Sequence, residues 1–176
     1  MDKPWINHYP PGMPSEVKLD TFASLVDLLD DAFTRHAQRD AAICMNRHLT
    51  YQGLDEASKA IAAWLQSRGV VQGDRVALMM PNVPQYMVAI AGVLRAGATV
   101  VNVNPLYTAR ELEHQLNDSG ATALIVLENF ATTVEEVIDK TAIKHVVLAS
   151  MGDMLGFWKG HWINFAVRHL GKLVPE

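Results

Sequence analysis

The chain has 176 residues, of which 49% are hydrophobic and 19% are charged, a composition typical of one globular domain rather than a disordered chain. Its 15 basic and 19 acidic residues give a net charge of −4, which argues against a nucleic-acid partner held by overall positive charge. Cys44 is the single cysteine, so an intramolecular disulfide is excluded.

The start of the chain is rich in proline. Four prolines occur within fourteen residues: Pro4, Pro10, Pro11 and Pro14. Because proline interrupts regular helices, we expect residues 1–20 to form an extended arm and not a helix. Trp5 and Tyr9 suggest that this arm packs on another surface. A helix is expected next, because the apolar positions from Phe22 to Phe33 recur with helical spacing.

The middle of the chain alternates between two kinds of pattern. Residues 41–46 and 48–51 are predicted as short strands, followed by a helix from Leu54 to Leu65. Four apolar strands then begin near Arg75, Thr99, Ala123 and His145, with helices predicted over 84–96, 108–119 and 130–141. This alternation favours an α/β fold in which a mostly parallel sheet has helices on both faces, and we assign residues 21–150 to that subdomain.

Two polar turns follow strands of the predicted sheet. Asn82 comes after the strand near Arg75, and Asn104 and Tyr107 come after the strand near Thr99. Ligands of open parallel sheets bind beyond the carboxyl ends of the strands, so these residues are candidates for a ligand or domain-interface edge. The alternative is structural, because asparagine side chains also shape turns through hydrogen bonds.

Motifs for catalysis and phosphate binding are missing. The sequence contains neither G-x-G-x-x-G nor G-x-S-x-G. Gly92 and Gly97 have the spacing of a phosphate-binding loop, but Ala98-Thr99 stands where such a loop needs lysine and serine or threonine. One cysteine cannot build a thiolate zinc cage. We therefore assign no catalytic, cofactor-binding or metal-binding residue.

Residues 151–176 differ from the rest of the chain. They are rich in aromatic residues, and from 154 to 175 they contain basic residues but no acid. We predict an amphipathic segment that forms a membrane or docking face from five residues: Trp158, Trp162, Phe165, Arg168 and Lys172. The aromatic members would meet an apolar surface, while Arg168 and Lys172 would face water or lipid phosphate. Docking onto a missing domain is the equal alternative.

Several motifs together resemble the adenylate-forming acyl-CoA synthetases. They are Leu49–Leu54 (LTYQGL), Gly73–Asn82 (GDRVALMMPN) and Gly92–Gly120 (GVLRAGATVVNVNPLYTARELEHQLNDSG). The stretch Asn102–Gly120, the opening Trp5–Pro10 (WINHYP) and Met151–Met154 (MGDM) are similar to bacterial long-chain fatty-acid–CoA ligases in particular. Gly53 departs from the family, which usually has an acidic residue there.

The resemblance implies a parent enzyme that converts ATP, a long-chain fatty acid and coenzyme A into acyl-CoA, AMP and diphosphate through an acyl-adenylate, with Mg²⁺. The family's phosphate loop, its adenine and ribose motifs and its catalytic lysine are not found here. We therefore expect an incomplete N-terminal subdomain that is inactive alone and has no cofactor of its own. Its last segment, residues 151–176, would lead to the missing remainder of the enzyme.

The expected partners of the parent are the remainder of the enzyme, a second copy in a homodimer, and a peripheral membrane contact, with no nucleic acid. Its expected location is the cytoplasm, at the inner face of the membrane. Two other functions stay open at this point. The chain could be a stand-alone α/β binding module that uses the edge at Asn82 and Asn104, or a membrane-surface adaptor built on residues 154–175.

Overall fold

The N-terminal arm contains a short helix. The computed structural model describes residues 3–16 and 21–174, so parts of the predicted arm (1–2 and 17–20) and of the last segment (175–176) lie outside the described residues. The 3-10 helix η1 (Pro4–His8) corrects the prediction of an entirely extended arm. Pro4 occupies the first turn, where its fixed φ suits a helix and its missing N–H is not needed. Trp5 is 52% exposed, so it packs on the rest of this chain less than the sequence suggests.

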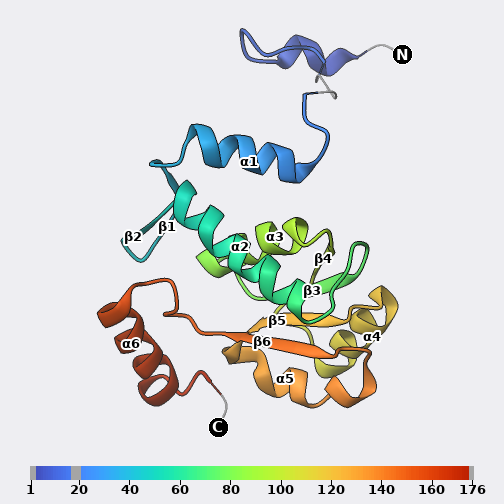
Figure 1. Ribbon diagram of the computed structural model, residues 1–176, viewed down its shortest axis with the longest axis vertical. Helices are drawn as coiled ribbons and strands as arrows, with labels where there is room; N and C mark the ends of the chain where they lie inside the picture. The colour runs from blue at the N-terminus through green and yellow to red at the C-terminus, as the bar shows by residue number, and fades with distance from the viewer. Residues whose placement is uncertain (1–2, 17–20, 175–176) are drawn as a thin grey trace.

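A helix and a hairpin precede the main sheet (Figure 1). Helix α1 (Leu25–Arg35) begins after Ser24, whose hydroxyl accepts the Asp27 N–H at 3.1 Å. Strands β1 (Asp40–Cys44) and β2 (Arg47–Thr50) form where the sequence predicts two short strands, and they pair antiparallel. Met45 and Asn46 form the turn with positive φ angles of 49° and 59°, the backbone of the tight turns that suit hairpins. Thr50 then caps α2 (Tyr51–Ser67).

Four parallel strands form the main sheet, at the positions predicted from the sequence. They are β3 (Arg75–Met79), β4 (Thr99–Asn102), β5 (Ala123–Leu127) and β6 (His145–Ala149). Their spatial order is β4-β3-β5-β6, and every neighbouring pair is parallel. All four carboxyl ends therefore lie at one edge of the sheet, which we call the carboxyl edge.

Helices cover both faces of the sheet, which confirms the predicted fold class. On one face, Val76 and Ile125 pack with residues of α2 and of α3 (Pro84–Arg95). On the other, Leu124 and Val126 pack with α4 (Ala109–Ser119) and α5 (Ala131–Glu135). Alternate residues of β5 thus belong to separate apolar clusters, because side chains alternate between the faces of a strand.

The helix predicted over 130–141 is broken in the structure. The segment forms the 3-10 turn η2 (Glu128–Phe130), the five-residue α5 and the 3-10 turn η3 (Ile138–Lys140). The β-branched run Thr132-Thr133-Val134 lowers helix propensity, which gives a physical reason for the interruption. As a result the face of the sheet that α5 covers is less protected over β6, where Val146 and Leu148 are exposed.

The last segment forms α6 (Phe157–Phe165), which continues into a π-helical turn, η4 (Ala166–Leu170). In Figure 1 it lies beside the sheet, at the end of β6. Two residues that follow strands tie it to the carboxyl edge, Glu128 after β5 and Ser150 after β6. The aromatic segment therefore lies next to the edge at which the sequence predicts a ligand or an interface.

Candidate functional site: the carboxyl edge of the sheet

The two polar turns follow strands that are neighbours in the sheet. Asn82 follows β3, Asn104 follows β4, and these strands are paired in the sheet. The side-chain Oδ1 of Asn104 accepts the Leu106 N–H at 3.0 Å, and its carbonyl accepts the Tyr107 N–H at 3.1 Å. This side chain shapes its own turn, so the structural alternative describes Asn104. Tyr107 is half-buried against the cluster that contains Leu112.

Asn82 borders a small apolar hollow. The hollow measures about 300 Å³ and lies between β1 and the start of α3, with Ile43, Cys44, Pro84 and Met87 among its lining residues. Asn82 supplies an amide, which can donate and accept hydrogen bonds, at the rim of an otherwise apolar wall. This arrangement can hold an apolar group beside one polar atom, and it provides no nucleophile positioned next to a base.

Tyr86 belongs to the same edge, although the sequence patterns do not single it out. Its hydroxyl donates a 2.6 Å hydrogen bond to Oδ1 of Asn102, the last residue of β4. The bond ties the first turn of α3 to the end of β4. Tyr86 recurs with the apolar positions of its helix, so its polar role could be read only from the three-dimensional contact.

Glu128 and Arg168 form an ion pair that the sequence analysis missed. Arg168 donates from Nη2 and Nε to Oε2 of Glu128 at 2.7 and 3.1 Å, and from Nη2 to the Ser150 hydroxyl at 2.9 Å. The hydrogen bond to Glu128 is the main cause that raises the pKa of Arg168 above its ordinary value. Glu128 is buried, and an acid directly after the apolar strand ALIVL was the available signal.

This ion pair gives one residue of the last segment a partner within the chain. The guanidinium of Arg168 is bound to Glu128, while its side chain remains 45% exposed. The aromatic members Trp158, Trp162 and Phe165 are exposed, and Lys172 is exposed with a positive φ of 47°. The structure therefore separates Arg168 from the other four members of the predicted face.

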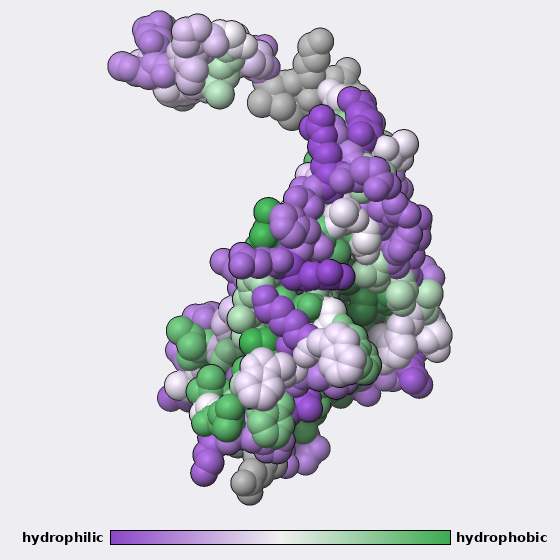
Figure 2. All heavy atoms as spheres, turned by 90° about the vertical axis from the view of Figure 1, so that its left-hand side faces the viewer, coloured by the Kyte–Doolittle hydropathy of each residue, from purple (hydrophilic) through white to green (hydrophobic). Residues whose placement is uncertain are grey.

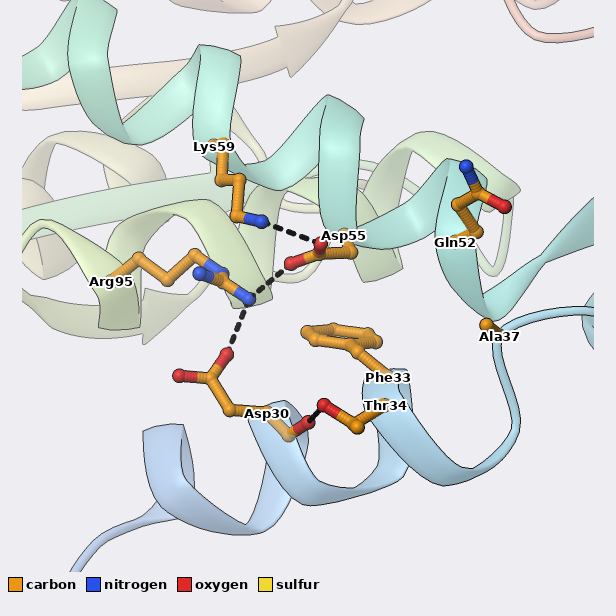
Figure 3. Close-up of a pocket in the computed structure, with 8 residues that line it drawn as sticks. All are labelled: Asp30, Phe33, Thr34, Ala37, Gln52, Asp55, Lys59 and Arg95. Carbon is orange, nitrogen blue, oxygen red and sulfur yellow. Dashed lines mark hydrogen bonds and ion pairs between the residues drawn. The ribbon is translucent and has the colours of Figure 1, made fainter.

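A second polar cluster, drawn in Figure 3, holds helices together. Arg95 of α3 donates from Nη2 to Oδ1 of Asp30 and Oδ1 of Asp55, both at 2.5 Å. Its guanidinium lies 5.2 Å from the ring centre of Phe33. Lys59 also donates to Asp55 at 2.6 Å. Both carboxylates already bind Arg95, so this cluster is a clamp between α1, α2 and α3 rather than a ligand site.

The described residues do not make a metal or triphosphate site. Across residues 3–16 and 21–174 no group of three or more histidine, cysteine, aspartate or glutamate side chains could hold a metal ion. Gly92 and Gly97 lie at the end of α3, before β4, and not between a strand and a following helix. A phosphate-binding loop needs the opposite order, because the helix N-terminus must meet the anion.

Comparison with known proteins gives the family. The model of the AMP-binding enzyme family matches residues 29–166. Long-chain-fatty-acid–CoA ligases of Escherichia coli O157:H7 and Salmonella typhimurium are 52% and 53% identical over this whole chain, which covers 32% of each relative. The chain thus spans about a third of the length of these curated relatives.

A solved structure agrees with this assignment. The long-chain-fatty-acid-CoA ligase of Archaeoglobus fulgidus is 30% identical with a TM-score of 0.71, and the match covers 80% of this chain and 30% of that one. None of the helices in the part of the chain that the structure describes is long and apolar enough to cross a membrane. Since the family model matches well over half of the chain, this chain belongs to the AMP-binding enzyme family.

Proposed function

We propose that this chain is the N-terminal α/β part of a long-chain fatty-acid–CoA ligase. The observation that carries the proposal is the 52% identity to a long-chain-fatty-acid–CoA ligase over the complete chain. The whole enzyme would convert ATP, a long-chain fatty acid and coenzyme A into acyl-CoA, AMP and diphosphate, with Mg²⁺. The resemblance of Asn102–Gly120 to the same ligases supports this substrate class.

Within that enzyme, the residues of this chain would act as a scaffold. The chain's side chains do not fit ATP phosphates or Mg²⁺, because the described residues offer neither a suitable glycine-rich loop nor a metal-ligand cluster. What they build is a parallel sheet whose carboxyl edge presents Asn82, Tyr86 and an apolar hollow. We infer that this edge contacts the remaining two thirds of the enzyme, where the catalytic groups would lie.

We infer three further properties of the whole enzyme. It acts in the cytoplasm, it touches the inner face of the membrane peripherally, and it forms a homodimer. Val146 and Leu148 are exposed on one face of the edge strand β6. They support an additional protein contact, because exposed apolar side chains favour association and the edge strand can also pair with another chain. The chemistry of long-chain fatty acids, which partition into bilayers, supports the membrane contact.

The test compares this chain with a chimera that joins it to the remaining two thirds of the Escherichia coli relative. With ATP, Mg²⁺, coenzyme A and oleate, we expect the chimera to form oleoyl-CoA and release diphosphate, while the chain alone matches a blank without protein. Thermal melts confirm that both proteins fold. Saturable, oleate-dependent diphosphate release by the pure chain would falsify the scaffold role, and a folded chimera that activates benzoate but not oleate would contradict the substrate class.

A further inference from the structure

Helix α6 turns its polar side toward the protein. Gly160, Asn164 and Arg168 are spaced four residues apart, so they lie along one side of the helical segment. The Gly152 N–H donates to Oδ1 of Asn164 at 2.6 Å, Gly160 is in close backbone contact with Gly152, and Arg168 binds Glu128. These three contacts fix the orientation of α6 on the sheet domain.

The opposite side of α6 is an exposed aromatic ridge made of Trp158, Trp162 and Phe165. The exposed Phe157 adds to it at the first turn of the helix, where its ring centre lies 5.2 Å from that of Trp158. Trp158 is 84% exposed and Trp162 is 61% exposed. The rings lie against one another, with the centres of Trp162 and Phe165 5.9 Å apart and stacked. Green and pale side chains gather over α6 in the lower half of Figure 2. A helix on a soluble protein normally turns its apolar side inward, so this ridge marks a contact with a partner.

The charge around the ridge indicates what that partner is. Residues 154–174 contain Lys159, Arg168 and Lys172 and no acid, whereas the rest of the chain has 12 basic and 19 acidic residues. Glu128 neutralises Arg168, which leaves Lys159 and Lys172. Lys159 donates to the carbonyl of Met45, and this bond holds its side-chain nitrogen beside the ridge. The partner should therefore have an apolar interior and a negatively charged surface.

We propose that the aromatic ridge rests on the surface of an anionic lipid bilayer. Tryptophan and phenylalanine beside lysine are the residues that interfacial helices place at the boundary between headgroups and acyl chains. Because Glu128 and Ser150 hold η4 at the carboxyl edge, the bilayer would lie next to that edge. This inference rests on the proposed function, since an enzyme for long-chain fatty acids finds its substrate in membranes.

Vesicle binding tests the proposal on this chain. We expect co-sedimentation with vesicles of phosphatidylcholine and phosphatidylglycerol in equal parts, weakened by salt, and little binding to pure phosphatidylcholine. Trp158→Ser/Trp162→Ser should lower the affinity by roughly tenfold or more, because burial of one large apolar side chain is worth about 1.5–3 kcal/mol. The matched control is Trp5→Ser, which removes an exposed tryptophan from η1 and should leave binding unchanged.

A second pair of substitutions tests the charge. Lys159→Gln keeps a donor for the Met45 carbonyl, and Lys172→Asn keeps a residue that tolerates positive φ. Each should lower affinity for the anionic vesicles about fivefold, the effect of one basic residue near such a surface. Binding that survives both tryptophan replacements, or that is equal on neutral and anionic vesicles, overturns the proposal.

The chimera distinguishes the bilayer from a protein partner. If the folded chimera fails to bind vesicles that the chain binds, the rest of the enzyme covers the ridge and the proposal is wrong. If Trp158→Ser/Trp162→Ser abolishes self-association of the chain without changing vesicle binding, the ridge contacts a second copy and the proposal is also wrong. Oleoyl-CoA formation by the same chimera is measured separately, so loss of vesicle binding with activity retained overturns the membrane contact and leaves the proposed ligase function standing.

Discussion

Gly160 of α6 lies so close to Gly152 that a methyl group on Gly160 would overlap the carbonyl oxygen of Gly152. Two backbone segments thus touch directly, and only glycine fits on either side. The same helix side carries Asn164, which accepts the Gly152 N–H. The contact explains how a helix with an exposed aromatic side can still hold one orientation on the domain.

We predict that Gly160→Ala detaches α6 from the domain while the sheet stays folded. Overpacking at such a contact costs about 1–3 kcal/mol, and α6 has few other contacts that could compensate. Hydrogen exchange of residues 157–170 should become faster, with exchange in β3 and β5 unchanged. Gly171→Ala is the matched control, since its added methyl would meet the flexible side chain of Leu173 at 3.3 Å and the carbonyl oxygen of Ala166 only at 3.5 Å, an ordinary contact. Equal protection in both variants would show that the close contact does not hold α6.

Within the polar cluster of Figure 3, Arg95 should contribute more to stability than the exposed Lys59. Arg95 is the common donor to Asp30 and Asp55, and its side chain is 13% exposed. Arg95→Ala leaves two carboxylates without this partner and removes the contact with Phe33. We therefore expect the free energy of unfolding to fall by about 2 kcal/mol. Lys59→Ala removes an exposed pair on α2 and should cost about 0.5 kcal/mol or less. Chemical denaturation of both variants measures the difference, and equal losses would contradict the clamp.

The sheet was predictable because its signal is local and repeated. The strands near Arg75, Thr99, Ala123 and His145 are continuous apolar runs, and both faces of the sheet need apolar residues when helices cover them. The capping box of Thr108 and Glu111 was equally readable, because its two partners are three residues apart. Patterns among residues close in sequence were therefore enough to predict most of the fold.

The contacts that arrange the carboxyl edge were not predictable from sequence. Glu128 and Arg168 lie 40 residues apart, and nothing in the sequence pattern connects them. The turn at Asn104 was readable as a turn, but its side chain could equally have served a ligand until the hydrogen bond to Leu106 was known.

The outermost strand of the sheet, β6, leads to a prediction about self-association. Leu148 of β6 is 59% exposed beside an unpaired strand edge, so it is the residue through which two copies of this chain would meet. Leu148→Lys should reduce association at high concentration in sedimentation experiments and change stability by no more than about 0.5 kcal/mol. Val71→Lys adds the same charge at an exposed apolar residue outside the sheet and should leave association unchanged. Association that both lysines reduce equally would point to net charge and not to β6.

The capping box of α4 gives the pH dependence that the structure supports. Hydrogen bonds from the backbone N–H and hydroxyl of Thr108, at 2.9 and 2.8 Å, lower the pKa of Glu111 below its ordinary value of 4.5. A carboxylate with a lowered pKa in the folded state stabilises the fold above its ordinary pKa, and the contribution disappears as the pH falls through the folded-state value. We therefore expect Glu111→Gln to be less stable than the parent chain at pH 7, because the neutral amide accepts these bonds more weakly. The gap between their denaturation midpoints should shrink steadily as the pH falls below 4.5, once the carboxylate of the parent chain becomes protonated.

Glu113→Gln removes a carboxylate from the same helix but not from its cap, so it should not reproduce this convergence. A gap for Glu111→Gln that is constant from pH 7 into the acid range would show that its carboxylate does not carry the cap.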